Sequence, residues 1–147
     1  MKLTTRAHYS VKALLDLTLQ PKHKPVSVMA IAQRQDIPAP YLEKLLIELR
    51  RAGLVYSIRG PQGGYCLASP PAQISLGQIL AAVGETINPL PHHQPQRDQA
   101  TDWVTYWLWQ RLDDQLTQSL NRMTLADLYY DARSQAASQN NQDQFVV

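Results

Sequence analysis

The amino-acid sequence predicts a mainly α-helical protein with a small β-hairpin, and three observations support that fold class. Three segments with the apolar spacing of helices open the chain, and a glycine-rich strand–turn–strand pattern follows them directly. In the second half, apolar residues recur at every fourth position along one long segment. This order is that of a winged helix-turn-helix unit followed by a long dimerisation helix. The 147 residues, 44% of them hydrophobic, suffice for one ordinary domain with a core.

The first helix is expected over residues 5–19, because apolar residues are dense there and Pro21 and Pro25 end the pattern. Ser27 occupies the position of an N-cap, and the short second helix that follows it reaches Gln35. These two segments supply the first part of a helix-turn-helix.

Residues 36–40 form a tight connector, because Pro38 and Pro40 disfavour helical backbone in the residues before them. A third helix opens at Pro40, which a first helical turn tolerates, and Gly53 ends it. The apolar stripe of this helix consists of Tyr41, Leu42, Leu45, Leu46 and Leu49.

A hairpin follows, with one strand over residues 54–58, a glycine-rich turn over 59–64 and the returning strand over 65–67. Ser75 and Gln78 then form a capping-box pattern that starts a short helix. The hairpin is the predicted wing.

The second half contains one long helix that begins near Thr101, and Thr124 with Asp127 caps a short last helix. The expected organisation is a winged helix-turn-helix DNA-binding domain over 1–85, a loop over 86–100, the dimerisation helix and short C-terminal helix over 101–133, and a disordered Ser/Gln/Asn-rich tail over 134–147.

Composition excludes several classes of protein. Cys66 is the single cysteine, so an intramolecular disulfide and an all-cysteine metal cage are both excluded. The N-terminal segment is polar and lacks the apolar core of a signal peptide. The longest uncharged run, between Arg59 and Glu85, contains prolines and glycines that exclude a membrane-spanning helix. The sequence predicts a soluble, cytoplasmic protein.

The net charge of +2 divides unevenly along the chain. Residues 1–71 carry ten Lys and Arg against four Asp and Glu, a net charge of +6, whereas residues 72–147 carry four Arg against eight acids, a net charge of −4. The basic half is the half that has the helix-turn-helix pattern. Charge and motif therefore both indicate double-stranded DNA as the partner.

The third helix of such a unit enters the major groove with its N-terminal residues toward the bases. Glu43 suits the cytosine amino group as an acceptor, with a solvated surface charge as the alternative. Arg50 and Arg51 suit phosphates, with a solvated helix face as an equal alternative. Arg59 at the base of a thin turn suits the minor groove. The candidate DNA contacts are Thr5, Arg6, Tyr9, Ser27, Met29, Pro38, Pro40, Tyr41, Glu43, Lys44, Arg50, Arg51, Arg59, Pro61 and Gly63.

The long helix has more apolar surface than one small domain needs to cover it. We interpret the surplus as a twofold interface between two copies of the chain, with a ligand box for the tryptophans as the less favoured alternative. The candidate dimerisation residues are Trp103, Val104, Trp107, Leu108, Leu112, Leu116 and Leu120.

These motifs together resemble the IscR/NsrR/CymR group, the Rrf2 family of bacterial winged helix-turn-helix regulators. The resemblance covers nearly everything except the 86–100 loop and the tail, and the wing is its most specific part. It rests on Lys2-Leu3-Thr4, Tyr9-Ser10-Val11, Tyr41-Leu42-Glu43, Leu54-Val55, Arg59-Gly60-Pro61-Gln62-Gly63-Gly64-Tyr65, Ile79-Leu80-Ala81-Ala82-Val83 and Leu120-Asn121-Arg122-Met123-Thr124-Leu125-Ala126-Asp127-Leu128. The resemblance implies homodimers that bind operator DNA through the third helix and the wing.

The 86–100 loop departs from the family pattern. Cluster-binding members carry three cysteines there, but this loop has none, and Tyr106 stands where one member has a histidine ligand. We therefore expect no iron–sulfur cofactor. His92 and His93 are interpreted as solvated loop residues rather than metal ligands. Cys66 is interpreted as a buried wing residue, with a redox or nitrosylation switch as the alternative.

The sequence thus predicts a homodimeric, sequence-specific transcriptional regulator, a repressor acting on a pseudo-palindromic operator. The alternative from another class is a winged-helix interaction module that docks a partner enzyme. Cys66 has no sequence-adjacent histidine or acid that could act as its base, so we do not expect an enzyme. The effector, protein or small molecule, is not specified by the sequence.

Overall fold

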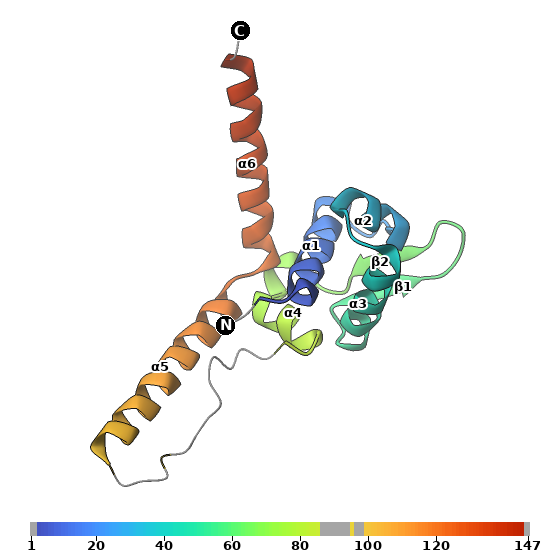
Figure 1. The fold of residues 1–147 in the computed structure, drawn as a ribbon. Coiled ribbons are helices and arrows are strands. Elements are labelled where there is room, and N and C mark those ends of the chain that lie inside the picture. Colours follow the sequence, from blue (N-terminus) through green and yellow to red (C-terminus); the bar gives the residue numbers. More distant parts are fainter. Residues whose placement is uncertain (1–2, 86–94, 96–98, 146–147) are drawn as a thin grey trace.

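The computed structural model describes residues 3–85, 95 and 99–145. Within them, six α-helices and one two-stranded antiparallel sheet follow each other in the predicted order, which confirms the mainly α fold class (Figure 1). The elements are α1 (Thr5–Leu19), α2 (Val28–Gln35), α3 (Ala39–Arg51), β1 (Val55–Ile58), β2 (Gly64–Leu67), the short 3₁₀ helix η1 (Pro71–Gln73), α4 (Leu76–Ala82), α5 (Ala100–Arg122) and α6 (Leu125–Phe145).

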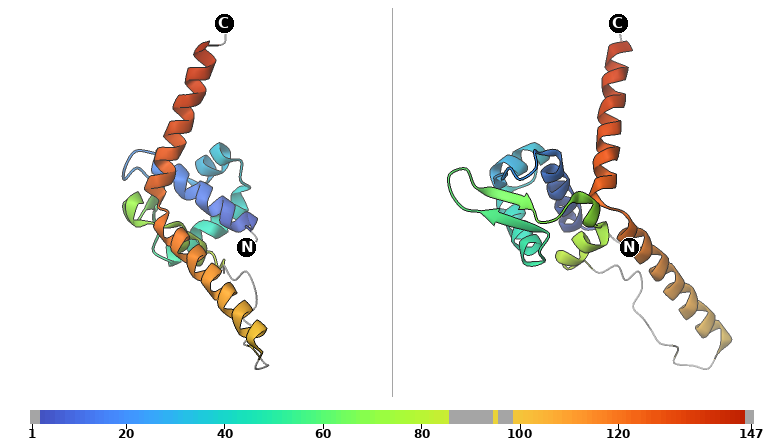
Figure 2. Two further views of the ribbon diagram at one scale, coloured as in Figure 1. Left: turned by 90° about the vertical axis from the view of Figure 1, so that its left-hand side faces the viewer. Right: turned by 180° about the vertical axis from the view of Figure 1, so that it is seen from behind.

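Helices α1 to α4 and the hairpin form one body, from which the two long helices extend in different directions (Figures 1 and 2). The hairpin leaves the body on the side away from α5 (Figure 1). The first turns of α6 pack against α1 and η1, while its distal part projects beyond the body. None of the helices in the described part of the chain has both the length and the apolar character needed to cross a bilayer.

Local capping sets the helix starts, as expected from the sequence. The Ser27 side chain accepts a hydrogen bond from the backbone N–H of Ala30 at 3.1 Å, which confirms it as the N-cap of α2. Ser75 and Gln78 form both hydrogen bonds of a capping box at the start of α4. Thr124 and Asp127 likewise exchange hydrogen bonds before α6.

The core is built mainly from the inward faces of the first three helices. Leu42, Leu45, Leu46 and Leu49 of α3 are completely buried, against Leu14 of α1 among others. Deleting a buried leucine side chain typically costs about 2–5 kcal/mol. The α3 leucine stripe thus fixes which face of α3 remains outward.

The hairpin is joined to the body at the start of β2. Val26 and Tyr65 exchange two backbone hydrogen bonds of 3.0 and 2.8 Å, which form an isolated antiparallel bridge. A Cβ atom at Gly64 would lie 2.3 Å from the Val26 carbonyl oxygen, so this close approach requires glycine. The bridge holds the wing beside the segment that leads into α2.

The C-terminal end of the chain differs from the sequence prediction. A short last helix and a disordered tail from residue 134 were expected, but α6 continues to Phe145, so this prediction was wrong. The segment carries no apolar face, which is why periodicity did not reveal it. It also contains no proline or glycine, and its alanines and glutamines favour helix, so the backbone continues from the packed first turns.

Candidate nucleic-acid interface

The outward face of α3 is polar and cationic. Because successive helix residues are about 100° apart, the face opposite the buried leucines consists of Pro40, Lys44, Ile47 and Arg51. Pro40, Lys44 and Arg51 are exposed and Ile47 is half-buried. Lys44 and Arg51 make no ion pair within the described part of the chain. This outward stripe presents two cations that form no ion pair with any described acid, and such cations suit contact with phosphates.

The two flanks of α3 have different surroundings. Glu43 and Arg50 are exposed on the flank toward the hairpin, where the Arg50 Nη1 atom lies 3.4 Å from the Ser57 hydroxyl oxygen of β1. Tyr41 faces α1 instead, with its ring edge-on to Tyr9 at 5.8 Å between centroids. Both tyrosines are half-buried, so the contact contributes to the helix packing as well as to any DNA surface.

Arg6, which the sequence suggests as a DNA contact, has partners inside the chain. Its guanidinium forms an ion pair with the Glu48 carboxylate of α3, and its Nε donates to the Val83 carbonyl at 3.1 Å. The hydrogen bond to Glu48 raises the pKa of Arg6 above its usual value. These contacts join α1, α3 and the end of α4, so Arg6 positions the helices whatever else it contacts.

The wing turn is exposed and narrow. Arg59 and Pro61 are exposed, and the Arg59 side chain makes no hydrogen bond or ion pair with any described residue. Gly63 is half-buried, and a Cβ atom there would lie 2.1 Å from the Ile58 carbonyl oxygen. Gly63 is therefore needed to close the turn, a structural role that the sequence did not separate from DNA contact.

The remaining candidate contacts lie near the starts of the helices. Thr5, Met29 and Pro38 are exposed, with Met29 at 64%. The Ser27 side chain is exposed too, but its oxygen caps α2. These residues are accessible to a ligand, and their DNA contacts remain predictions.

An ion pair between the buried Asp16 and the exposed Arg34, which sequence reasoning missed, fixes α2 on α1. Arg34 donates two hydrogen bonds of 2.9 and 2.7 Å to the Asp16 carboxylate, and Gln35 donates a third of 2.9 Å. Asp16 is only 2% exposed. Lys12 also reaches the Gln35 carbonyl at 2.5 Å. The sequence did contain a signal for this ion pair: Asp16 is an acid within the apolar pattern of the first helix, and a buried acid needs a partner.

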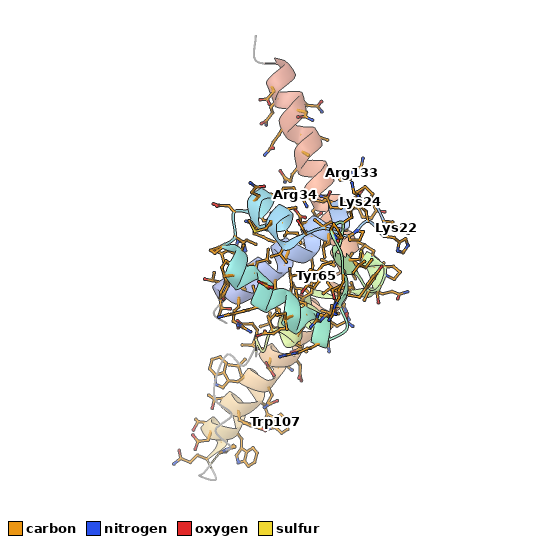
Figure 3. All side chains as sticks on the ribbon, turned by 90° about the vertical axis from the view of Figure 1, so that its right-hand side faces the viewer. Lys22, Lys24, Arg34, Tyr65, Trp107 and Arg133 are labelled. Carbon is orange, nitrogen blue, oxygen red and sulfur yellow. The ribbon has the colours of Figure 1, made fainter. Side chains whose placement is uncertain are left out.

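Helix α5 carries the exposed apolar surface. Trp103, Val104, Trp107, Leu108 and Leu112 are 41–67% exposed, and Figure 3 shows Trp107 far from the body of the chain. The other two candidate dimerisation residues lie differently. Leu120 is 7% exposed and packs with Ala7 and Leu80, and half-buried Leu116 packs against the same cluster. The chain's own body therefore covers the C-terminal end of the stripe.

Cys66 is a buried residue of β2, opposite Tyr56 in the hairpin ladder. The interaction of the Tyr56 hydroxyl with the Cys66 thiol raises the pKa of Tyr56 above its usual value. No cluster of three metal-ligating side chains occurs among residues 3–85, 95 and 99–145. His92 and His93 lie outside the described residues.

Comparisons with known proteins agree on one group. The family model described as Rrf2, iron-dependent transcriptional regulator, matches residues 3–131. The Synechocystis protein slr0846, whose name describes an HTH-type transcriptional regulator, is 58% identical over the full length of both chains.

Two solved structures share the fold. The structure of CymR, the global cysteine regulator of B. subtilis, superposes with a TM-score of 0.77 at 34% identity, covering 88% of this chain and 97% of that one. The structure of T. potens IscR superposes with a TM-score of 0.72 at 38% identity, covering 90% and 88%.

Proposed function

Because this chain belongs to the Rrf2 family of bacterial winged helix-turn-helix transcriptional regulators, we propose that it acts as a homodimer that binds a pseudo-palindromic operator and represses transcription. The proposal places the protein on DNA in the cytoplasm. Family membership makes it a DNA-binding regulator rather than an enzyme. The dimer, the direction of regulation and the residue roles are the parts proposed here.

The observation that supports DNA recognition best is that the outward cationic face of α3 lies next to the wing. Lys44 and Arg51 project from the face of α3 opposite the core, and the Arg59 side chain makes no hydrogen bond or ion pair with the described residues. Arg50 contacts Ser57, so the helix and the first wing strand form one continuous surface. In this arrangement α3 reads the major groove, with Glu43 beside the bases, and Arg59 enters the adjacent minor groove.

The test of the DNA interface is a titration of the chain's own upstream DNA against wild type and Arg59→Ala at several salt concentrations. We expect Arg59→Ala to lose about 1–3 kcal/mol of binding free energy. Arg133→Ala on α6 is the control, since it removes another exposed arginine, which contacts Tyr129 of its own helix and belongs neither to α3 nor to the wing. Equal affinity of wild type and Arg59→Ala would refute the role of the wing.

The exposed apolar face of α5 supports the homodimer. Large side chains such as Trp107 and Val104, exposed at 62% and 67%, are costly in water, and a second copy of the same helix covers them symmetrically. Sedimentation analysis of wild type and Trp107→Lys tests this interface. We expect a dimer for the wild type and a monomer for Trp107→Lys. A monomeric wild type would contradict the proposal.

We also propose that this regulator works without a family-type iron–sulfur cluster, although the family description is iron-dependent. The residues present do not fit the group, because residues 86–100 contain no cysteine and Cys66 is buried in β2. Anaerobically purified protein is expected to lack visible absorption and stoichiometric iron and sulfide. A bound cluster in that preparation would overturn this part of the proposal.

A further inference from the structure

A pocket of about 580 Å³ lies where the first turns of α6 begin, and no residue of α3 lines it. Its walls come from three parts of the chain: the C-terminal end of α1 with the connection after it, the end of β2 with η1, and the first turns of α6. Its volume falls in the range of roughly 300–1,000 Å³ that is typical of small-molecule sites. None of the residues assigned above to DNA binding or dimerisation lines it.

The pocket combines an apolar floor with a cationic rim. Leu17 and Leu67 contribute apolar surface, and the rings of Tyr129 and Tyr130 stand edge-on to each other at 5.5 Å on α6. Tyr130 is 68% exposed, a large fraction for an aromatic side chain. Such a surface suits a ligand with a flat apolar body.

The rim carries positive charge that no described acid neutralises. Lys22 and Lys24 are exposed, lie close together beside the base of α6 (Figure 3), and form no ion pair with the described residues. His23 lies between them with a left-handed φ of 61°, a conformation that costs energy in a non-glycine residue. The residues that line the pocket include no Asp or Glu. A ligand with negative charge therefore finds complementary charge at this rim.

We propose that this pocket binds a small organic anion with an apolar aromatic body, and that its occupancy changes the affinity for DNA. Cys66 and Leu67 of the pocket wall follow Tyr65 directly, and Tyr65 is hydrogen-bonded to Val26 next to the N-cap of α2. A ligand in the pocket thus touches the returning wing strand and the segment that leads into α2. The second half of this proposal rests on the DNA-binding function proposed above.

Binding is tested with anilinonaphthalene sulfonate, an aromatic anion whose fluorescence rises in apolar surroundings, on the full-length protein without DNA. We expect one site per chain. The double variant Lys22→Gln/Lys24→Gln removes the rim charge. We expect it to lower the affinity for the dye by roughly two- to thirtyfold, the contribution of two exposed ion pairs. Ala72→Trp, at an exposed position of η1, fills the pocket and is expected to abolish binding.

Three controls make the result specific. Lys44→Gln and Ala81→Trp change exposed residues of the same types outside the pocket, so the dye affinity should stay at the wild-type value. Neutral phenylnaphthylamine, which lacks the sulfonate, should bind weakly, and the lysine substitutions should not change its affinity. Circular dichroism of each variant checks that the fold is retained.

Several outcomes would overturn the site. Dye binding that neither pocket variant changes means that the dye occupies another surface, such as the aromatic face of α5. A neutral dye that is equally sensitive to the lysines refutes the anion specificity. Dye binding that disappears as the protein associates at higher concentration means that a second copy of the chain covers the pocket.

The regulatory half is tested by gel shift with upstream DNA at saturating dye. We expect a change of roughly fivefold or more in DNA affinity, within the usual range of coupling between two sites, and no change in Ala72→Trp. If bound dye does not change the affinity of the wild type for DNA, the coupling is refuted, whereas the proposed dye-binding site is not. A wild type that binds no DNA either with or without dye refutes the proposed function instead, and the dye titration is unaffected.

Discussion

Removal of either partner of the Asp16–Arg34 ion pair should have unequal effects on stability. The Asp16 side chain is 2% exposed, whereas that of Arg34 is 41% exposed. Arg34→Met leaves a carboxylate buried with one of its three hydrogen bonds, the one from Gln35. Breaking a buried pair in this way costs about 3–5 kcal/mol, and partial exposure of Arg34 places the expected loss near the lower value, about 3 kcal/mol.

The reverse substitution, Asp16→Asn, leaves an arginine that water can reach. The amide keeps the shape of the carboxylate and one acceptor oxygen, so we expect a loss of about 1–2 kcal/mol in the free energy of unfolding. The double variant Asp16→Asn/Arg34→Met removes the buried charge together with its partner. It should therefore be more stable than Arg34→Met alone, although it carries one substitution more.

Urea unfolding followed by circular dichroism measures these differences. All variants are compared at one protein concentration, because association would otherwise shift the apparent stability. Arg50→Met is the matched control: among the described residues, the Arg50 side chain forms one hydrogen bond, to Ser57 at 3.4 Å, and a change within about 0.5 kcal/mol is expected. If Arg34→Met proves no more destabilising than Asp16→Asn, or the double variant is the least stable, the reasoning from burial is refuted.

Three further predictions follow from the wing and from α6. Gly63→Ala forces a Cβ atom against the Ile58 carbonyl and so distorts the wing turn. We expect the affinity for DNA to fall while the far-ultraviolet circular dichroism spectrum stays helical, and an affinity equal to that of the wild type would contradict this. Cys66→Ala removes the thiol that raises the pKa of Tyr56, so an NMR titration of the Tyr56 ring should give a lower pKa than in the wild type. An equal pKa would refute the contact between the two side chains. Deletion of residues 134–147 should change the free energy of unfolding by less than about 0.5 kcal/mol, because side chains 134–143 are exposed. A larger decrease of this free energy in urea unfolding would show that the segment is packed.

Short-range patterns predicted much of this protein. The helix over residues 5–19, the Ser27 cap and the capping box at Ser75 involve partners within a few positions in the chain, so their residue types alone specify them. The leucine stripe of the third helix likewise defined its inward face, and hence the outward stripe with Lys44 and Arg51. The glycine-rich run predicted the wing because turns with close backbone approach accept few other residues.

The sequence therefore determined by itself the order of the elements, most of their ends and the cationic face that supports DNA binding. Only the tertiary structure decided that Arg6 and Arg34 have internal partners, 42 and 18 positions away in the chain. The same holds for Leu120, which the chain's own body covers, and for the pocket at the base of α6. The reason is physical. Caps and apolar periodicity arise from neighbours along one element. Ion pairs, buried helix ends and pockets arise where separate elements meet, and the local residue pattern does not specify which elements will meet.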